Sequence, residues 1–239
     1  MTVPIIMVDH HFWEASALFN PNAFPSRIRP EARTCGDRLA ILTHSVEIVL
    51  SEPGLNRGRL LEQIRTHPSF VGFTPRADKP AVLVFHNLNF LSGLYSALVA
   101  LKSLLDLYAR LIAHLLVPKA SVFGFNKAPY KGRKISGGRF LNWVERSAPT
   151  SFRNRDVLIS LLLSHIDQWI DTAIGYRDAV VHDGFIRGMT EAMVPLDRES
   201  RQLSDREVLL PLMPNQMPVS EYCEHLVSFT RALLAETLF

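Results

Sequence analysis

The segment YRDAVVHDG, residues 176–184, brings an arginine, an aspartate and a histidine within two helical turns. Asp178 and His182 are four positions apart, so on a helix the carboxylate can contact the imidazole and fix its tautomer and orientation. An imidazole held in this way can carry a proton near neutral pH, and Arg177 supplies a permanent positive charge. These residue types therefore suit proton transfer beside an anionic group.

A helix with one buried face is expected to position these residues. Apolar side chains recur before the segment at alternating steps of three and four, the spacing of such a helix. Arg177 is in line with apolar positions, so its guanidinium must be paired or point into a cleft. Gly184 is expected to end the helix and to leave His182 near its negative end, where a protonated ring is favoured. The apolar stripe consists of Ile159, Leu162, Ile166, Trp169, Ala173, Tyr176 and Val180.

The rest of the chain predicts a mainly α protein. Leucines at steps of three and four in the longest helical segment are typical of a bundle with shallow crossing angles. We expect an up-and-down helical bundle with a small β-hairpin, within residues 185–213, before the C-terminal helix. The other helices are expected from Asp37 to the break at Pro53, over residues 57–66, from Pro80 to Val117, and from Ser220 onward.

Length and composition favour one helical domain over residues 36–239, preceded by an irregular, proline-containing arm over residues 1–35. The formal net charge is +3, so the distribution of charge matters more than its total. Cys35 and Cys223 are too few for a disulfide framework or a cysteine metal site, and they suit a reducing cytoplasm. No cofactor fingerprint is present, because no glycine-rich turn joins a strand to a helix.

Two weaker features have ordinary explanations. Asp9, His10, His11 and Glu14 could suggest metal ligands, but adjacent histidines point in different directions and no second ligand cluster follows, so we expect no metal. The run at 81–101 is long enough for a membrane span, but its polar residues and the charges that continue the helix argue against one.

Asp106 has two interpretations. With Lys102 and Arg110 it forms a series of charges spaced four apart, which is common on an exposed helix face. Alternatively, Asp106 reaches Arg177 across the bundle and positions it.

A basic segment, residues 119–139, is interleaved with aromatic residues and contains no acidic residue. It could be a solvated loop. Beside an Arg/His segment, a flexible basic loop with exposed rings would also suit phosphates and stacked bases of single-stranded nucleic acid. The candidate RNA-binding residues are Lys127, Tyr130, Lys131, Arg133 and Lys134.

The 176–184 segment resembles the signature of the HEPN superfamily, small helical bundles that carry Arg, a polar residue and, a few positions later, His. Arg177, Asp178 and His182 match that pattern, with four residues between Arg177 and His182. Arg38 and His44 have a similar spacing but lack the polar residue after the arginine. The resemblance covers residues 80–239 most firmly, and its specificity lies in the segment itself.

The resemblance implies a metal-independent endoribonuclease that leaves a 2′,3′-cyclic phosphate and requires no cofactor. Arg177 and His182 would be catalytic, and Asp178 would hold the imidazole. It also implies a homodimer in which two such helices meet at a two-fold axis. One alternative is a non-catalytic binding or regulatory module, such as a defence-system component or the partner of a separately encoded antitoxin or nucleotidyltransferase, in which Arg177 and His182 form a structural pair. The other is a helical interaction protein in which the Arg/His spacing is a coincidence.

Overall fold

The computed structural model describes residues 10–11, 14–15, 19–66, 72–75, 80–85, 88–118, 120–122, 124–149, 152–183, 191–195 and 208–238. The protein is mainly helical with small antiparallel sheets, as predicted. Its helices are α2 (Arg29–Leu50), α3 (Arg57–Thr66), α4 (Leu88–Leu116), α5 (Gly138–Ser147), α6 (Arg155–His165), the π-helix η5 (Ile166–Ile170), α7 (Asp171–Asp183) and α8 (Val219–Leu238). Short 3-10 turns are η1 (Pro21–Ala23), η2 (Ser26–Ile28) and η3 (Pro53–Leu55). The strands are β1 (Gly72–Pro75), β2 (Pro80–Phe85), β3 (Ala128–Tyr130), β4 (Arg133–Ile135) and β5 (Glu191–Pro195).

The chain divides into two compact units, and each is described by itself. The first consists of residues 1–44, 96–177 and 228–239, and the second of residues 45–95 and 178–227.

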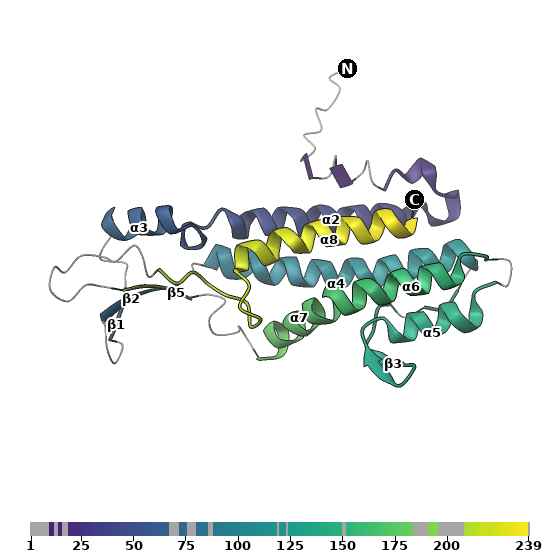
Figure 1. Ribbon diagram of the computed structural model, residues 1–239. Helices are drawn as coiled ribbons and strands as arrows, with labels where there is room; N and C mark the ends of the chain where they lie inside the picture. Colours follow the sequence, from purple (N-terminus) through teal and green to yellow (C-terminus); the bar gives the residue numbers. More distant parts are fainter. Residues whose placement is uncertain are drawn as a thin grey trace, which may run out of the picture. The chain divides into compact units, whose positions relative to one another are not determined.

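The first unit is a helical bundle (Figure 1). Polar contacts join helices of this bundle that are distant in sequence. Glu31 of α2 approaches the His114 ring of α4 at 3.4 Å, and the Tyr108 hydroxyl of α4 donates a hydrogen bond of 2.7 Å to Thr237 of α8. His165 of α6 contacts Glu236 of α8. Helices distant in sequence therefore share one core.

The apolar seam predicted for the longest helix is confirmed in α4. Side chains at steps of three and four are almost completely buried, because they face neighbouring helices rather than solvent. Those that broaden the face are also buried, as expected for a central helix. The buried seam comprises Leu94, Leu98, Leu101, Leu105, Tyr108 and Ile112, and the broader face includes Ala97, Ala100, Leu104 and Leu111.

The helix that carries the Arg/His segment is continuous from α6 through η5 to α7. The predicted stripe is buried at Ile159, Leu162, Ile166, Trp169 and Ala173. Tyr176 and Val180, nearer the C-terminal end, are half-buried. The sequence pattern did not predict the π-helical turn, because one wider turn changes the stripe only slightly.

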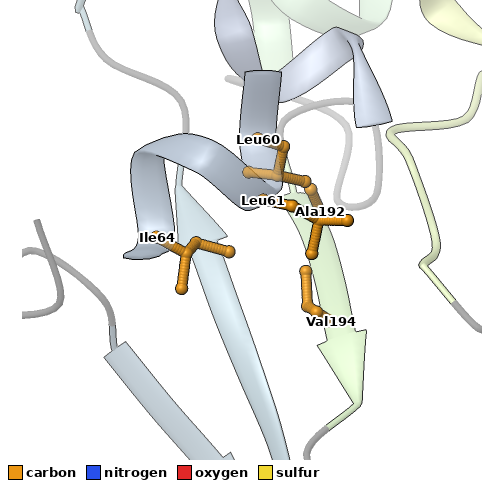
Figure 2. Packing of buried hydrophobic residues seen from close by; sticks show 5 residues of the cluster. All are labelled: Leu60, Leu61, Ile64, Ala192 and Val194. Atoms are coloured by element: carbon orange, nitrogen blue, oxygen red, sulfur yellow. The ribbon is translucent and has the colours of Figure 1, made fainter. Parts of the chain in front are cut away.

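In the second unit, α3 packs on the sheet formed in the order β1-β2-β5 (Figure 2). Leu60, Leu61 and Ile64 recur at helical spacing and bury one face of α3. They meet Ala192 and Val194, which alternate along β5 and so share one face of the sheet. The predicted helix over residues 57–66 is confirmed.

The predicted starts of two helices were wrong. α2 begins at Arg29 rather than near Asp37, because Pro30 is tolerated in a first helical turn, so residues 29–35 are not part of an irregular arm. The long helix begins at Leu88 rather than after Pro80, because the preceding residues form β2. That run contains β-branched and aromatic side chains, and its backbone pairs with strands on both sides.

The predicted hairpin at 185–213 is realised in part. Met193 and Leu209 exchange two backbone hydrogen bonds of 2.8 Å. However, β5 pairs along its length with β2, so its main partner is distant in sequence. Residues 184–190 and 196–207, including Gly184, lie outside the described residues.

Among the described residues, two helices are long and apolar enough to cross a membrane, α4 and the helix from Arg155 to His182. In each, 50% of the most apolar window is buried inside the protein. Core helices of globular domains have the same length and composition.

Candidate functional site

Arg177, Asp178 and His182 all lie on α7. Arg177 is half-buried and its Nε atom is shielded from solvent, as expected for a guanidinium that leaves the helix beside an apolar stripe. His182 is in the last turn and its side chain is exposed. The helix therefore presents a half-buried cation and, five positions later, an accessible imidazole.

The predicted contact between Asp178 and His182 is not formed. Among the described residues, His182 has no hydrogen-bond or ion-pair partner. The two side chains have the right spacing, but His182 is exposed and water competes for its ring, so the pair gains little from a fixed geometry. The imidazole is therefore not held by that carboxylate in this structure.

The predicted basic loop contains an ordered hairpin. Strands β3 and β4 pair in antiparallel register, with Tyr130 opposite Arg133. Lys131 and Gly132 form the turn with φ angles of 44° and 80°, the left-handed conformation that two-residue hairpin turns require. Lys119 and Phe123, at the start of the basic segment, lie outside the described residues.

Three aspartates from neighbouring helices fix this segment. The Asp106 carboxylate of α4 accepts a 2.6 Å hydrogen bond from the Phe125 backbone N–H. The Asp171 carboxylate accepts one of 2.7 Å from the Ser136 backbone N–H. Asp167 receives two hydrogen bonds from the Arg133 guanidinium, which lower the pKa of the carboxyl group and raise that of the guanidinium. Acidic side chains of the helices thus bind the basic segment before, within and after the hairpin.

The Asp106 contacts favour a structural role for this carboxylate. Besides the Phe125 N–H, it binds the Lys102 ammonium at 2.6 Å, which is the helix-face pair that the spacing predicted. Gly124, with a φ of 89°, lies so close to Asp106 that an added Cβ would be 2.5 Å from its Oδ1 atom. The Asp106 carboxylate therefore holds the segment around Gly124 and Phe125 against α4.

We expect Asp106→Ala to lower the free energy of unfolding by about 1–3 kcal/mol, because the Phe125 N–H loses its acceptor. Urea denaturation checks this value. Asp156→Ala is the matched control and should change it by less than about 0.5 kcal/mol, because the Asp156 side chain is 88% exposed. If Asp106 instead acts by positioning Arg177, Asp106→Asn should impair activity while stability is retained.

The four basic candidates for RNA binding fall into three groups. Lys127 and Lys134 are exposed and, within the described part of the chain, have no ion-pair partner. Lys131 lies 3.4 Å from a Glu145 carboxylate oxygen and 5.2 Å from the centre of the Tyr130 ring. Arg133 is exposed but paired with Asp167.

Tyr130 does not offer an exposed ring, and that prediction was wrong. Its side chain is only 3% exposed, and Phe125 is fully buried. Alternation along β3 directs the Tyr130 ring inward while Pro129 faces outward. The described lysines of this segment are exposed, but these two rings are not available for base stacking.

Other candidate chemistry is limited. Burial raises the pKa of both Cys35 and Cys223 to about 12, so neither thiol is a ready nucleophile. Glu14 pairs with Arg231 at 2.7 Å. The His10 and His11 rings are tilted by 41° with their centroids 3.8 Å apart, and Asp9 lies outside the described residues.

A comparison with protein-family models, curated proteins and solved structures finds no match to this chain.

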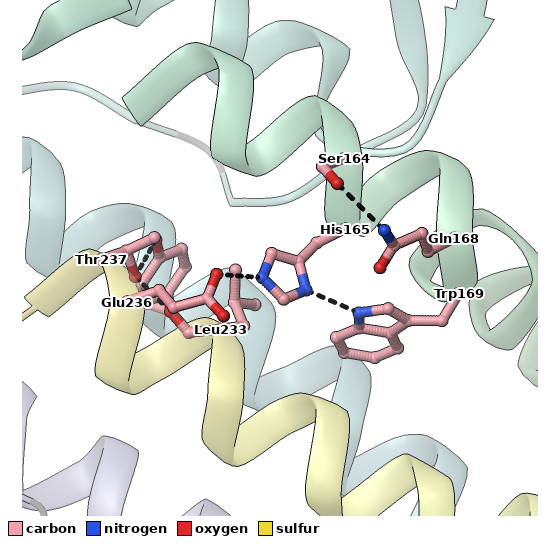
Figure 3. A network of polar contacts seen from close by, with 8 residues as sticks. Ser164, His165, Gln168, Trp169, Leu233, Glu236 and Thr237 are labelled. Atoms are coloured by element: carbon pink, nitrogen blue, oxygen red, sulfur yellow. Dashed lines mark hydrogen bonds and ion pairs between the residues drawn. The ribbon is translucent and has the colours of Figure 1, made fainter. Parts of the chain in front are cut away.

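A polar network around the buried His165 ring was not predicted from the sequence (Figure 3). The Trp169 indole N–H donates a 2.9 Å hydrogen bond to His165 Nδ1, and His165 Nε2 lies 3.0 Å from Glu236 Oε2. A histidine and a tryptophan four apart were a detectable signal, but the glutamate is 71 residues away in sequence. Only the tertiary structure brings it to the ring.

Proposed function

We propose that this protein is a metal-independent endoribonuclease of the HEPN type. The observation that carries the proposal is the pair formed by Arg177 and His182 on α7, a half-buried arginine followed by an exposed imidazole. The mainly helical fold is compatible with a HEPN bundle.

In the proposed reaction the RNA supplies its own nucleophile. The 2′-hydroxyl attacks the adjacent phosphorus, the bond from phosphorus to the 5′-oxygen breaks, and a 2′,3′-cyclic phosphate and a 5′-hydroxyl result. His182 accepts the proton of the 2′-hydroxyl or, in its protonated form, donates one to the leaving 5′-oxygen. Arg177 stabilises the negative charge that develops on the phosphoryl oxygens. Because Asp178 does not contact the ring, RNA itself would have to orient His182.

The proposal is tested by incubating an end-labelled RNA pool with the protein in EDTA. Cleavage that resists the chelator and leaves cyclic phosphates supports it. Cleavage that EDTA abolishes would contradict a mechanism carried by Arg177 and His182 alone.

The exposed face of the β3–β4 hairpin is the proposed phosphate contact. Lys127 and Lys134 are exposed and not engaged in ion pairs within the described residues, so they can release counterions when they bind RNA. We expect the double variant Lys127→Ala/Lys134→Ala to bind RNA about threefold to tenfold more weakly at 0.1 M salt. Its affinity should also depend less steeply on salt concentration.

Binding titrations with single-stranded RNA at several salt concentrations check this expectation. Arg65→Ala/Arg146→Ala is a control of equal charge change at exposed helix positions. Equal loss with both variants would indicate a general charge effect and would argue against the hairpin as the contact.

A binding or regulatory module is the second candidate, and the shielding of Arg177 favours it. A partly buried guanidinium can hold a bundle together, and truncating it then costs stability. In that role the partner would be a second copy of the chain, or a separately encoded antitoxin or nucleotidyltransferase. Both candidates assume a cytoplasmic protein that does not depend on a membrane.

A further inference from the structure

A cavity of about 340 Å³ opens at one end of the first unit. Its walls come from the last turn of α4, the first turns of α6 and the last turn of α8. Most lining side chains are apolar, including Leu116, Phe152 and Leu161, and Val157 lines it although it is 59% exposed. This size is in the lower range for small-molecule sites.

Glu236 is the one charged side chain among the described residues that line the cavity. The Glu236 side chain is 48% exposed. One of its carboxylate oxygens, Oε2, contacts His165 Nε2 (Figure 3). Whether the cavity carries a negative charge therefore depends on the protonation state of His165.

Trp169 determines that state. The indole N–H can only donate, so His165 Nδ1, which it contacts at 2.9 Å, must accept with its lone pair. The ring proton is then on Nε2 and is donated to Glu236. The imidazole is thereby neutral, and the pair carries the full negative charge of the carboxylate.

From this arrangement we propose that the cavity binds a small molecule with an apolar body and a single cationic amine. The apolar body fills the space between α4, α6 and α8, and the ammonium binds the carboxylate of Glu236. Anionic ligands such as nucleotides are disfavoured, because no cation is among the described lining residues. The site is independent of the RNA chemistry proposed for α7.

Hexylamine is a suitable probe, with hexanol and hexanoate as matched compounds of neutral and negative charge. We expect hexylamine to bind about fivefold more tightly than hexanol, and hexanoate to bind more weakly than either. Affinity for hexylamine should fall as salt rises. Titrations followed by the ¹H–¹⁵N signal of the Trp169 indole measure binding at this site, because that N–H belongs to the network of Glu236.

Three variants test the assignment. Glu236→Gln removes the charge and should abolish the preference for the amine, whereas Glu221→Gln, an exposed control on the same helix, should retain it. Val157→Trp should fill the cavity and weaken both hexylamine and hexanol, and the exposure of Val157 keeps this change out of the core. Equal binding of amine and alcohol by the wild type, an amine preference retained in Glu236→Gln, or no saturable binding of any probe would overturn the proposal.

Discussion

His182→Ala is expected to lower RNA cleavage by about 10²–10⁴-fold, because the reaction loses its proton carrier. The fold should be retained, since the side chain is exposed and its truncation costs less than about 0.5 kcal/mol. Arg177→Ala should lower cleavage by about 10²–10³-fold through lost transition-state stabilisation. Single-turnover cleavage of labelled RNA in EDTA, with melting curves on the same samples, measures both effects.

His44→Ala is the matched control for the histidine variant. His44 is an exposed histidine that belongs to the second Arg/His pair of similar spacing, so its loss should leave cleavage unchanged. Arg177→Lys is the companion for the arginine, because it keeps the charge but loses the bidentate geometry. Wild-type cleavage by the His182 variant would refute the nuclease proposal. An inactive wild type, together with unfolding or loss of dimerisation in the Arg177 variants, would support the structural role.

Gly137→Ala is expected to lower the free energy of unfolding by about 2–4 kcal/mol. Gly137 precedes α5 with a φ of 71°, a conformation that costs a residue with a side chain about 1–2 kcal/mol. In addition, an added Cβ would lie 2.5 Å from ring atoms of Phe125, which is fully buried and cannot move without repacking. Urea denaturation measures the loss.

Gly132→Ala separates the two causes. Gly132 has a φ of 80°, but an added Cβ would meet nothing within 4 Å. This variant should therefore lose only the free energy of holding a residue with a side chain in the left-handed backbone conformation. We expect a loss of about 1–2 kcal/mol. Equal losses of unfolding free energy in the two variants would show that the Phe125 ring moves aside without cost. The close packing of Phe125 against Gly137 would then not contribute to stability.

Several helices could be predicted because their own residues determine them. The seam of α4 and the stripe from Ile159 to Ala173 are buried as their spacing indicates. Helical periodicity is a local property, so it survives whatever packs against it. The start of α4 was harder to predict, because residues 80–85 are apolar enough for either state and become a strand only by pairing with β1 and β5.

The candidate site, too, could be predicted from the sequence only in part. The sequence by itself determined that Arg177 and His182 share a helix, that Arg177 leaves it beside apolar neighbours, and that a basic segment precedes it. Only the tertiary structure decided that this segment is a hairpin attached to Asp106, Asp167 and Asp171, with Tyr130 buried. It also decided that Glu236 meets His165 beside the cavity. Spacing along a helix specifies which residues share a face, whereas a contact between distant segments depends on how the whole bundle packs.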